Sequence, residues 1–148
     1  MSKTSRNRSQ RGVVGKIGNA AAGFAANSRA PGNKIVHEVS IMAEAVRMAV
    51  ESAQAAGARR VTGLRLRVGI LSGAVPEAMR FAWDVVIRDT LAAGARLEIE
   101  SVPGLCWCAD CRAEFECAEF FNECPRCHNV SGELRRGREL EIASVEMN

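Results

Sequence analysis

The stretch from Cys108 to Cys127 reads CADC-RAEFECAEFFNE-CPRC, two Cys-x-x-Cys pairs with twelve residues between them. Twelve residues are enough to form a hairpin that brings both pairs to one point. Two residues between cysteines let each pair hold one ion, and four thiolates form the closed tetrahedral shell of a structural Zn²⁺ site. The spacing therefore predicts a zinc site made by Cys108, Cys111, Cys124 and Cys127.

Two other interpretations of the four cysteines stay open. Disulfides form in oxidising compartments, but the chain shows no apolar segment long enough for a signal peptide or a membrane span. This favours a cytoplasmic protein with reduced thiols and no membrane partner. Iron in a rubredoxin-like electron-transfer site is also compatible with the pattern, because a soft four-thiolate shell accepts either metal.

Three more residues lie close to the pairs. Cys106 and Cys117 fall outside them, and the single residue between Cys106 and Cys108 is too few for the usual metal-binding turn. We interpret both as buried or half-buried thiols. His128 follows the last cysteine, and we interpret it as a turn residue or a hydrogen-bond partner near a sulfur, because four thiolates already complete the shell.

The positive charge of the chain is concentrated in its first 35 residues. The whole chain of 148 residues has 20 Lys and Arg against 17 Asp and Glu, and seven of those cations but no acid lie in residues 1–35. Residues 36–148 therefore carry 13 basic and 17 acidic groups, a net charge of −4. Residues 1–35 are too polar to form a core and are predicted to be a disordered basic leader. The acidic remainder gives no expectation of nucleic-acid binding.

Hydrophobic periodicity predicts two helices and three strands in the rest of the chain. An apolar stripe that begins at Ile41, after a capping Ser40, predicts a helix that closes near Gly57. A second stripe begins at Pro76 and continues to Leu91. Alternating apolar residues predict strands over 61–70, 95–102 and 138–147, the last with a change of phase that a bulge near Ala143-Ser144 would repair.

The cysteine region lies between the second and third predicted strands. The predicted fold class is therefore α+β, a small two-helix, three-strand sheet domain with an inserted four-cysteine zinc-ribbon lobe. We place the domains at 36–103 plus 137–148 for the α+β body and 104–136 for the zinc lobe, which is too small to fold without its metal. No catalytic set and no Gly-rich phosphate loop is visible, so the chain is not expected to be an enzyme.

In the order and spacing of its motifs the chain resembles the HypA/HybF family of nickel metallochaperones for [NiFe] hydrogenase maturation. The resemblance covers residues 36 to the C-terminus. The segments that carry it are Val36-His37-Glu38-Val39-Ser40, Val68-Gly69, Pro76-Glu77, Phe81-Ala82-Trp83, Gly94-Ala95-Arg96-Leu97-Glu98-Ile99, the two cysteine pairs and Glu139-Leu140-Glu141-Ile142.

The resemblance implies a second metal site and a set of partners. His37 is implied as the Ni²⁺ ligand, with Glu38 beside it, and the four paired cysteines as the structural Zn²⁺ ligands. Ni²⁺ would be transient cargo, delivered to the precursor of a [NiFe] hydrogenase large subunit with the help of a nickel-handling maturation GTPase. A homodimer is also implied. The competing class is a zinc-ribbon module for protein or nucleic-acid interaction.

Two departures from the family pattern bear on nickel. The family begins at Met-His-Glu, whereas here 35 residues precede Val36. Because a GTG codon encodes valine and also initiates bacterial translation, we hypothesise that the working protein begins at position 36. Many members carry acidic residues at the positions of Val75 and Ile70, so no carboxylate ligand is implied from this loop, and Glu77 is the nearest acid.

Overall fold

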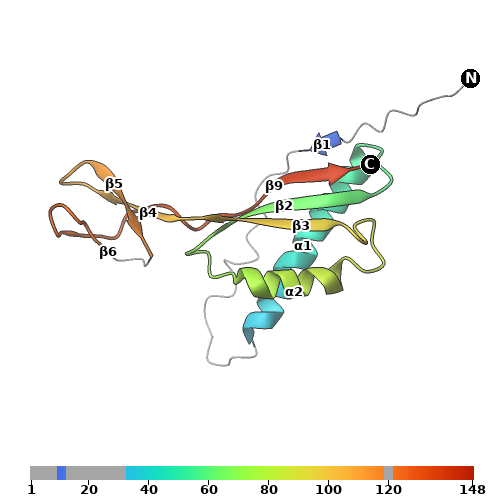
Figure 1. Ribbon diagram of the computed structural model, residues 1–148, viewed down its shortest axis with the longest axis horizontal. Coiled ribbons are helices and arrows are strands. Elements are labelled where there is room, and N and C mark those ends of the chain that lie inside the picture. Colours follow the sequence, from blue (N-terminus) through green and yellow to red (C-terminus); the bar gives the residue numbers. More distant parts are fainter. Residues whose placement is uncertain (1–9, 13–32, 119–121) are drawn as a thin grey trace, which may run out of the picture.

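A computed structural model describes residues 10–12, 33–118 and 122–148 (Figure 1). Two helices and a four-stranded sheet form a body, and a smaller β lobe extends from one end of that sheet. The sheet has the strand order β1-β9-β2-β3. The elements of the body are β1 (Gln10–Gly12), α1 (Asn33–Ala55), β2 (Val61–Gly69), α2 (Pro76–Val86), β3 (Arg96–Val102) and β9 (Leu140–Met147).

Helix α1 presents one apolar stripe to the core. The stripe that the periodicity predicts is buried, and its members are Ile41, Met42, Ala45, Val46, Ala49 and Ala53. The helix ends in a Schellman motif, in which Gly57 has a φ of 70° and the N–H of Ala58 donates to the carbonyl of Ala53 at 2.9 Å. The helix begins at Asn33, seven residues before the capping position predicted at Ser40. Val39, within this additional segment, packs against the core.

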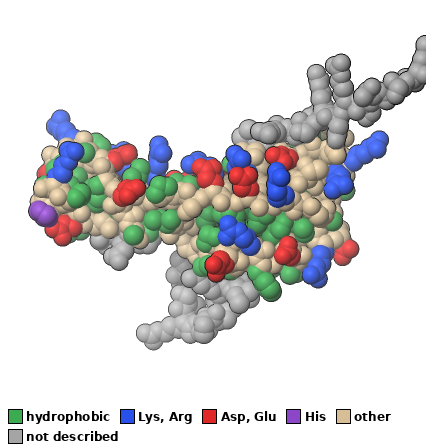
Figure 2. Space-filling model, in the orientation of Figure 1, with side chains coloured by type: hydrophobic (Ala, Val, Ile, Leu, Met, Phe, Trp, Pro, Cys, Tyr) green, Lys and Arg blue, Asp and Glu red, His purple; other side chains and the backbone are tan. Residues whose placement is uncertain are grey.

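Strand β2 lies at the centre of the sheet. It pairs with β3 in parallel, with α2 as the crossover, and with β9 in antiparallel. Leu64, Leu66 and Val68 are buried beneath the helices. The opposite face of the sheet is charged, and Figure 2 shows acidic and basic side chains side by side along the body. The ion pairs there include Arg65–Glu98, Arg67–Glu141 and Arg96–Glu146. Such exposed pairs contribute at most about 1 kcal/mol each, so the buried face carries the stability.

The predicted bulge in the last strand is confirmed. Arg65 of β2 pairs with Ser144 and the next residue, Leu66, pairs with Ile142, so Ala143 is left between two ladder positions. The extra residue shifts the phase of β9 by one. Ile142 and Val145 consequently both face the core, at 2% and 0% exposed.

Helix α2 is shorter than the sequence analysis predicts. It ends at Val86, and the chain then turns, with a φ of 59° at Asp89 and the hydroxyl of Thr90 bonded to the carbonyl of Ile87. Leu91, expected on the buried stripe, is 36% exposed as a result. The prediction for Leu91 was wrong because the local hydrogen bonds of Thr90 end the helical repeat first.

The lobe consists of two small sheets. The larger has the order β5-β4-β8 and the smaller pairs β6 with β7. Their bounds are β4 (Gly104–Cys108), β5 (Ala113–Cys117), β6 (Asn122–Glu123), β7 (Val130–Ser131) and β8 (Leu134–Arg136). The lobe is inserted between β3 and β9 of the body, as the sequence predicts.

Three glycines form the neck between body and lobe, at positions where the backbone segments nearly touch. The N–H of Gly69 donates to the carbonyl of Glu139, and the N–H of Leu71 donates to the carbonyl of Gly137, both at 2.7 Å. A methyl group on Gly69 would lie 2.0 Å from the Gly137 carbonyl oxygen, and one on Gly104 would lie 2.2 Å from that of Cys117. Only glycine fits at these two positions, because both obstacles are backbone atoms.

The predicted disordered leader is described only in part. Residues 10–12 form β1 on the edge of the sheet, paired with β9, and residues 33–35 belong to α1. For these residues the expectation of disorder does not hold, because backbone pairing with β9 and helical bonding order them without an apolar stripe. The prediction for residues 1–9 and 13–32 lies outside the described residues. In the described part of the chain, no helix has the length and apolar character needed to cross a membrane.

Candidate metal centres

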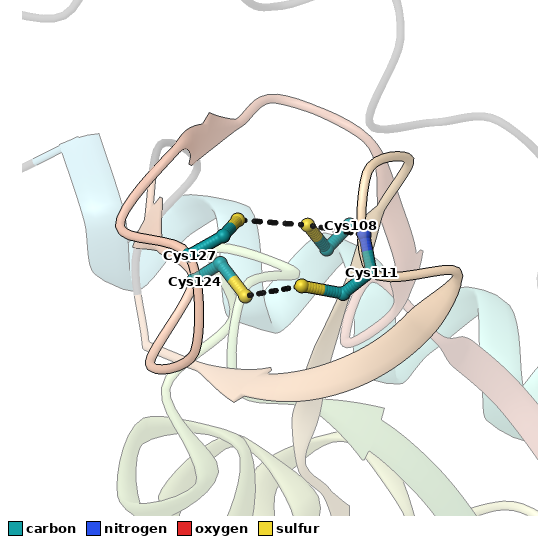
Figure 3. A group of neighbouring side chains, drawn as sticks. All are labelled: Cys108, Cys111, Cys124 and Cys127. Carbon is teal, nitrogen blue, oxygen red and sulfur yellow. Dashed lines mark hydrogen bonds between the residues drawn. The ribbon is translucent and has the colours of Figure 1, made fainter.

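The lobe brings the two predicted cysteine pairs together (Figure 3). The Sγ atoms of Cys108, Cys111, Cys124 and Cys127 all lie within 4.8 Å of one another. The Sγ of Cys108 is 3.5 Å from that of Cys127, and the Sγ of Cys111 is 3.9 Å from that of Cys124. A tetrahedral zinc ion with Zn–S distances of about 2.3 Å places its sulfurs about 3.8 Å apart, so the four thiols fit the ion.

Each pair sits in a tight turn that points its sulfurs inward. Cys108 ends β4, and the N–H of Cys111 donates to the Cys108 sulfur at 3.5 Å. In the second turn the N–H of His128 donates to the carbonyl of Cys124 at 2.9 Å, and His128 has a φ of 62°. Both turns reverse the chain within four residues, which is why two intervening residues let a pair hold one ion.

The thiols of the cluster differ in acidity. Backbone N–H groups of Cys127 and Arg126 lower the pKa of Cys124 to about 6. The pKa of Cys111 is raised to about 12, first by its hydrogen bond with the Cys127 thiol and then by burial. The protons are therefore shared unevenly among the sulfurs. A divalent cation that binds all four must displace protons, so metal affinity falls as pH falls.

Polar side chains outside the cluster tie the two turns together. Asp110, inside the first pair, accepts a hydrogen bond from the side-chain amide of Asn129, just after the second pair. His128 is exposed and its Nδ1 lies 2.8 Å from a carboxylate oxygen of Glu123, so it is a turn residue outside the thiol cluster. The Asp110–Asn129 bridge has no signal in the sequence, because the contact appears only once the two turns face each other.

The other two cysteines are buried, as expected, but they are not isolated. Cys106 is 0% exposed and Cys117 is 6% exposed, on the neighbouring strands β4 and β5. Their sulfur atoms are 2.7 Å apart. The sequence held a signal for this contact: a hairpin turn at 109–112 places residue 106 opposite 115 and therefore diagonally beside 117.

The residues implied for nickel lie in the body, on α1. His37 is half-buried, while Glu38 is 0% exposed and is the only charged residue in the described core. One Glu38 oxygen, Oε1, accepts the backbone N–H of Val75 at 3.2 Å, directly before α2. The other, Oε2, is the one buried side-chain polar atom among the described residues that has no hydrogen-bond partner. Within that part of the chain no third His, Cys, Asp or Glu completes a ligand cluster with them.

The Glu38 contact also explains how α2 begins. Val75, at the N-cap, has no side chain that could accept an orphan N–H of the first turn. Glu38 instead accepts the N–H of Val75 itself, so that a carboxylate from α1 lies at the positive end of α2. This role of Glu38 has no local signal in the sequence, because the two residues are 37 positions apart.

Comparison with known proteins places these features together in one family. A model of the family described as "Hydrogenase/urease nickel incorporation, metallochaperone, hypA" matches residues 36–147. The hydrogenase maturation factor HypA of Picosynechococcus sp. is 43% identical over 112 residues, which are 76% of this chain and 99% of that protein. Its counterpart in Geobacter metallireducens is 44% identical over 112 residues, and the match covers 72% of this chain and 99% of that protein.

Solved structures agree on the fold. The solution structure of the nickel metallochaperone HypA from Helicobacter pylori aligns with a TM-score of 0.53 at 23% identity, over 74% of this chain and 96% of that one. A second solution structure of a HypA protein aligns with a TM-score of 0.56 at 22% identity, over 76% of this chain and 97% of that one.

Proposed function

The chain belongs to the HypA family of nickel-incorporation metallochaperones, and from that premise we propose that it carries Ni²⁺ and delivers it to the large subunit of a [NiFe] hydrogenase. Two metal sites would have different roles. Cys108, Cys111, Cys124 and Cys127 would hold a resident Zn²⁺ that maintains the lobe. His37 and Glu38, on α1, would hold the Ni²⁺ cargo.

The chemistry of the donors supports this division. Four thiolates form a closed shell, which binds zinc tightly and leaves no open position. Imidazole nitrogen suits Ni²⁺, and a site with few protein ligands can release its ion. His37 is half-buried and reachable from solvent, whereas the cysteine cluster is tied into two turns. A carrier needs this contrast between a permanent and an exchangeable site.

The unpartnered oxygen of Glu38 is the structural observation that carries the nickel proposal. A buried carboxylate oxygen without a partner costs on the order of 1–3 kcal/mol, and more when it is charged. A cation bound jointly by this oxygen and the His37 imidazole would offset that cost. Because α1 begins at Asn33, the backbone N–H groups at His37 and Glu38 lie inside the helix, and the proposed shell uses side chains completed by water.

A nickel titration of the full chain tests the proposal. We expect the His37→Ala variant to bind Ni²⁺ at least about tenfold more weakly than wild type, a loss of about 1.4 kcal/mol or more. Zinc content, measured in parallel by elemental analysis, should stay unchanged, because His37 is not part of the thiol cluster.

His128→Ala is the matched control, because His128 is the only other histidine in the chain and lies exposed on the lobe. It should bind nickel as wild type does. Wild-type nickel affinity in His37→Ala would refute the assignment, and so would an equal loss of affinity in both variants.

The Glu38→Gln variant separates cargo binding from folding. A glutamine oxygen can still accept the N–H of Val75, so the start of α2 should be kept and unfolding should shift by no more than about 1 kcal/mol. The carboxylate charge is lost, and nickel affinity should fall. Isothermal titration with Ni²⁺ and thermal unfolding of the same samples measure the two effects. If the variant is destabilised by several kcal/mol but binds nickel normally, Glu38 only caps α2 and is not a nickel ligand.

We extend the proposal to the partners and the compartment. The sequence has no Gly-rich phosphate-binding motif, so GTP hydrolysis in this delivery step would belong to a separate nickel-handling GTPase. The client would be the precursor of the hydrogenase large subunit, and the carrier would work in the cytoplasm, with a homodimer as its expected assembly. Copurification of the full chain with the GTPase and with the precursor, in the presence and absence of Ni²⁺, tests these contacts.

A further inference from the structure

The lobe contains six cysteines, and only four of them belong to the zinc site. The remaining two, Cys106 and Cys117, form a pair of their own in the small core of the lobe. Their sulfur atoms lie 2.7 Å apart, with the Cys106 thiol donating to the Cys117 sulfur. Approach by less than about 1 Å would bring them to the S–S bond length of about 2.05 Å.

The strand register explains why the two sulfurs meet. Cys106 on β4 lies opposite Phe115, and Gly104 lies opposite Cys117, so the cysteines are diagonal neighbours of an antiparallel pair. The alternating burial of both strands places the two cysteines on the same face. The contact is therefore built into the hairpin and does not depend on a flexible loop.

A hollow in the surface leads to one member of the pair. Cys117 lines a space of about 310 Å³ at the neck, together with Pro103, Gly104 and Glu116. Cys106 is fully buried behind it. A small reagent would therefore meet Cys117 first and Cys106 second.

We propose that Cys106 and Cys117 form a two-electron dithiol–disulfide site beside the zinc cluster, whose co-substrates are low-molecular-weight disulfides. The Sγ of Cys117 attacks one sulfur of the small disulfide, the S–S bond of the reagent breaks, and one thiol leaves with the proton of Cys117. The Sγ of Cys106 then attacks the Cys117 sulfur of the mixed disulfide, and the second thiol leaves with the proton of Cys106. The protein dithiol is oxidised, and the small disulfide is reduced to two thiols.

Zinc protects the neighbouring cysteines from this exchange. A thiolate that ligates zinc must release the ion before it can form a disulfide, so the binding free energy of the metal opposes its oxidation. Cys106 and Cys117 have no such protection. Burial raises the pKa of Cys117 to about 12, which makes attack slow, but the position of the equilibrium is set by the reduction potential of the pair and not by the rate.

An equilibrium redox titration of the zinc-loaded full chain tests the site. The protein is incubated to redox equilibrium in buffers with an increasing ratio of 2-hydroxyethyl disulfide to 2-mercaptoethanol. Each sample is then denatured, alkylated and digested. We expect one internal disulfide per chain, between Cys106 and Cys117, with alkylated Cys108, Cys111, Cys124 and Cys127 and an unchanged zinc content. In Cys106→Ala the same buffers should instead leave a mixed disulfide on Cys117.

Three results would overturn the proposal. The first is a disulfide that includes a zinc-cluster cysteine, the second is loss of zinc before any Cys106–Cys117 bond appears, and the third is a wild-type chain that stays fully reduced in the most oxidising buffer. Because the peptide map and the zinc content of the wild-type chain decide among these results, the test does not depend on the variant folding.

Discussion

The Cys124→Ala variant should lose its zinc and unfold its lobe. The lobe has a core of five buried residues, Cys106, Cys108, Phe115, Cys117 and Cys124, of which only one is a large hydrocarbon side chain. So small a core cannot offset the conformational entropy of its chain. Zinc contributes about 10–16 kcal/mol of apparent binding free energy in small zinc-dependent folds, and removal of one thiolate forfeits most of it.

Zinc content by elemental analysis and amide hydrogen exchange of the lobe measure this effect. We expect exchange protection to disappear over residues 104–118 and 122–136 and to persist in β2 and α1, whose core is separate. Cys117→Ala is the matched control, a buried cysteine of the same lobe that lies outside the thiol cluster. Full zinc occupancy in Cys124→Ala, or equal zinc loss in the control, would contradict the assignment of the site.

The Gly69→Ala variant should be among the most damaging substitutions in the body. The added methyl group would lie 2.0 Å from the carbonyl oxygen of Gly137 and 2.7 Å from the backbone nitrogen of Arg138. Neither backbone can retreat without breaking the bonds that hold the neck, such as that from the N–H of Leu71 to Gly137. We expect a loss of more than about 3 kcal/mol in the free energy of unfolding, at the upper end for single substitutions.

Gly73→Ala is the control for the loss of glycine itself. Gly73 has a φ of 81°, but nothing lies within 4 Å of an added methyl group. Its substitution should cost only the strain of the left-handed conformation, about 1–2 kcal/mol. Denaturant unfolding of the zinc-loaded variants gives both values. If Gly69→Ala is no less stable than Gly73→Ala, the close approach at the neck is not a constraint.

Features determined by neighbouring residues could be predicted from the sequence. The stripe that starts at Ile41 fixes the buried face of α1, and each cysteine pair forms its turn within four residues. The bulge at Ala143 was predictable because the hydrophobic phase of the strand changes there, and a sheet buried on one face cannot accept that change without an extra residue.

Features that depend on distant partners could not be predicted in this way. The strand at Gln10–Gly12 exists because β9 offers an edge, and its own residues carry no apolar pattern. The buried position of Glu38 depends on its contact with Val75, which lies 37 positions away in the sequence. The interpretation of His37 came from family resemblance alone, because a single half-buried histidine has no distinctive signal.

The insertion of the lobe within the sheet has a consequence for synthesis on the ribosome. All four sulfur donors lie within residues 108–127, so the lobe can close on its ion soon after that segment emerges. The central strand of the body must wait for 20 further residues, because Val61 pairs with Met147. Since chains fold from the N-terminus as they emerge, we expect zinc capture to precede completion of the α+β body. A nascent chain would thus hold its zinc before the proposed nickel site is complete.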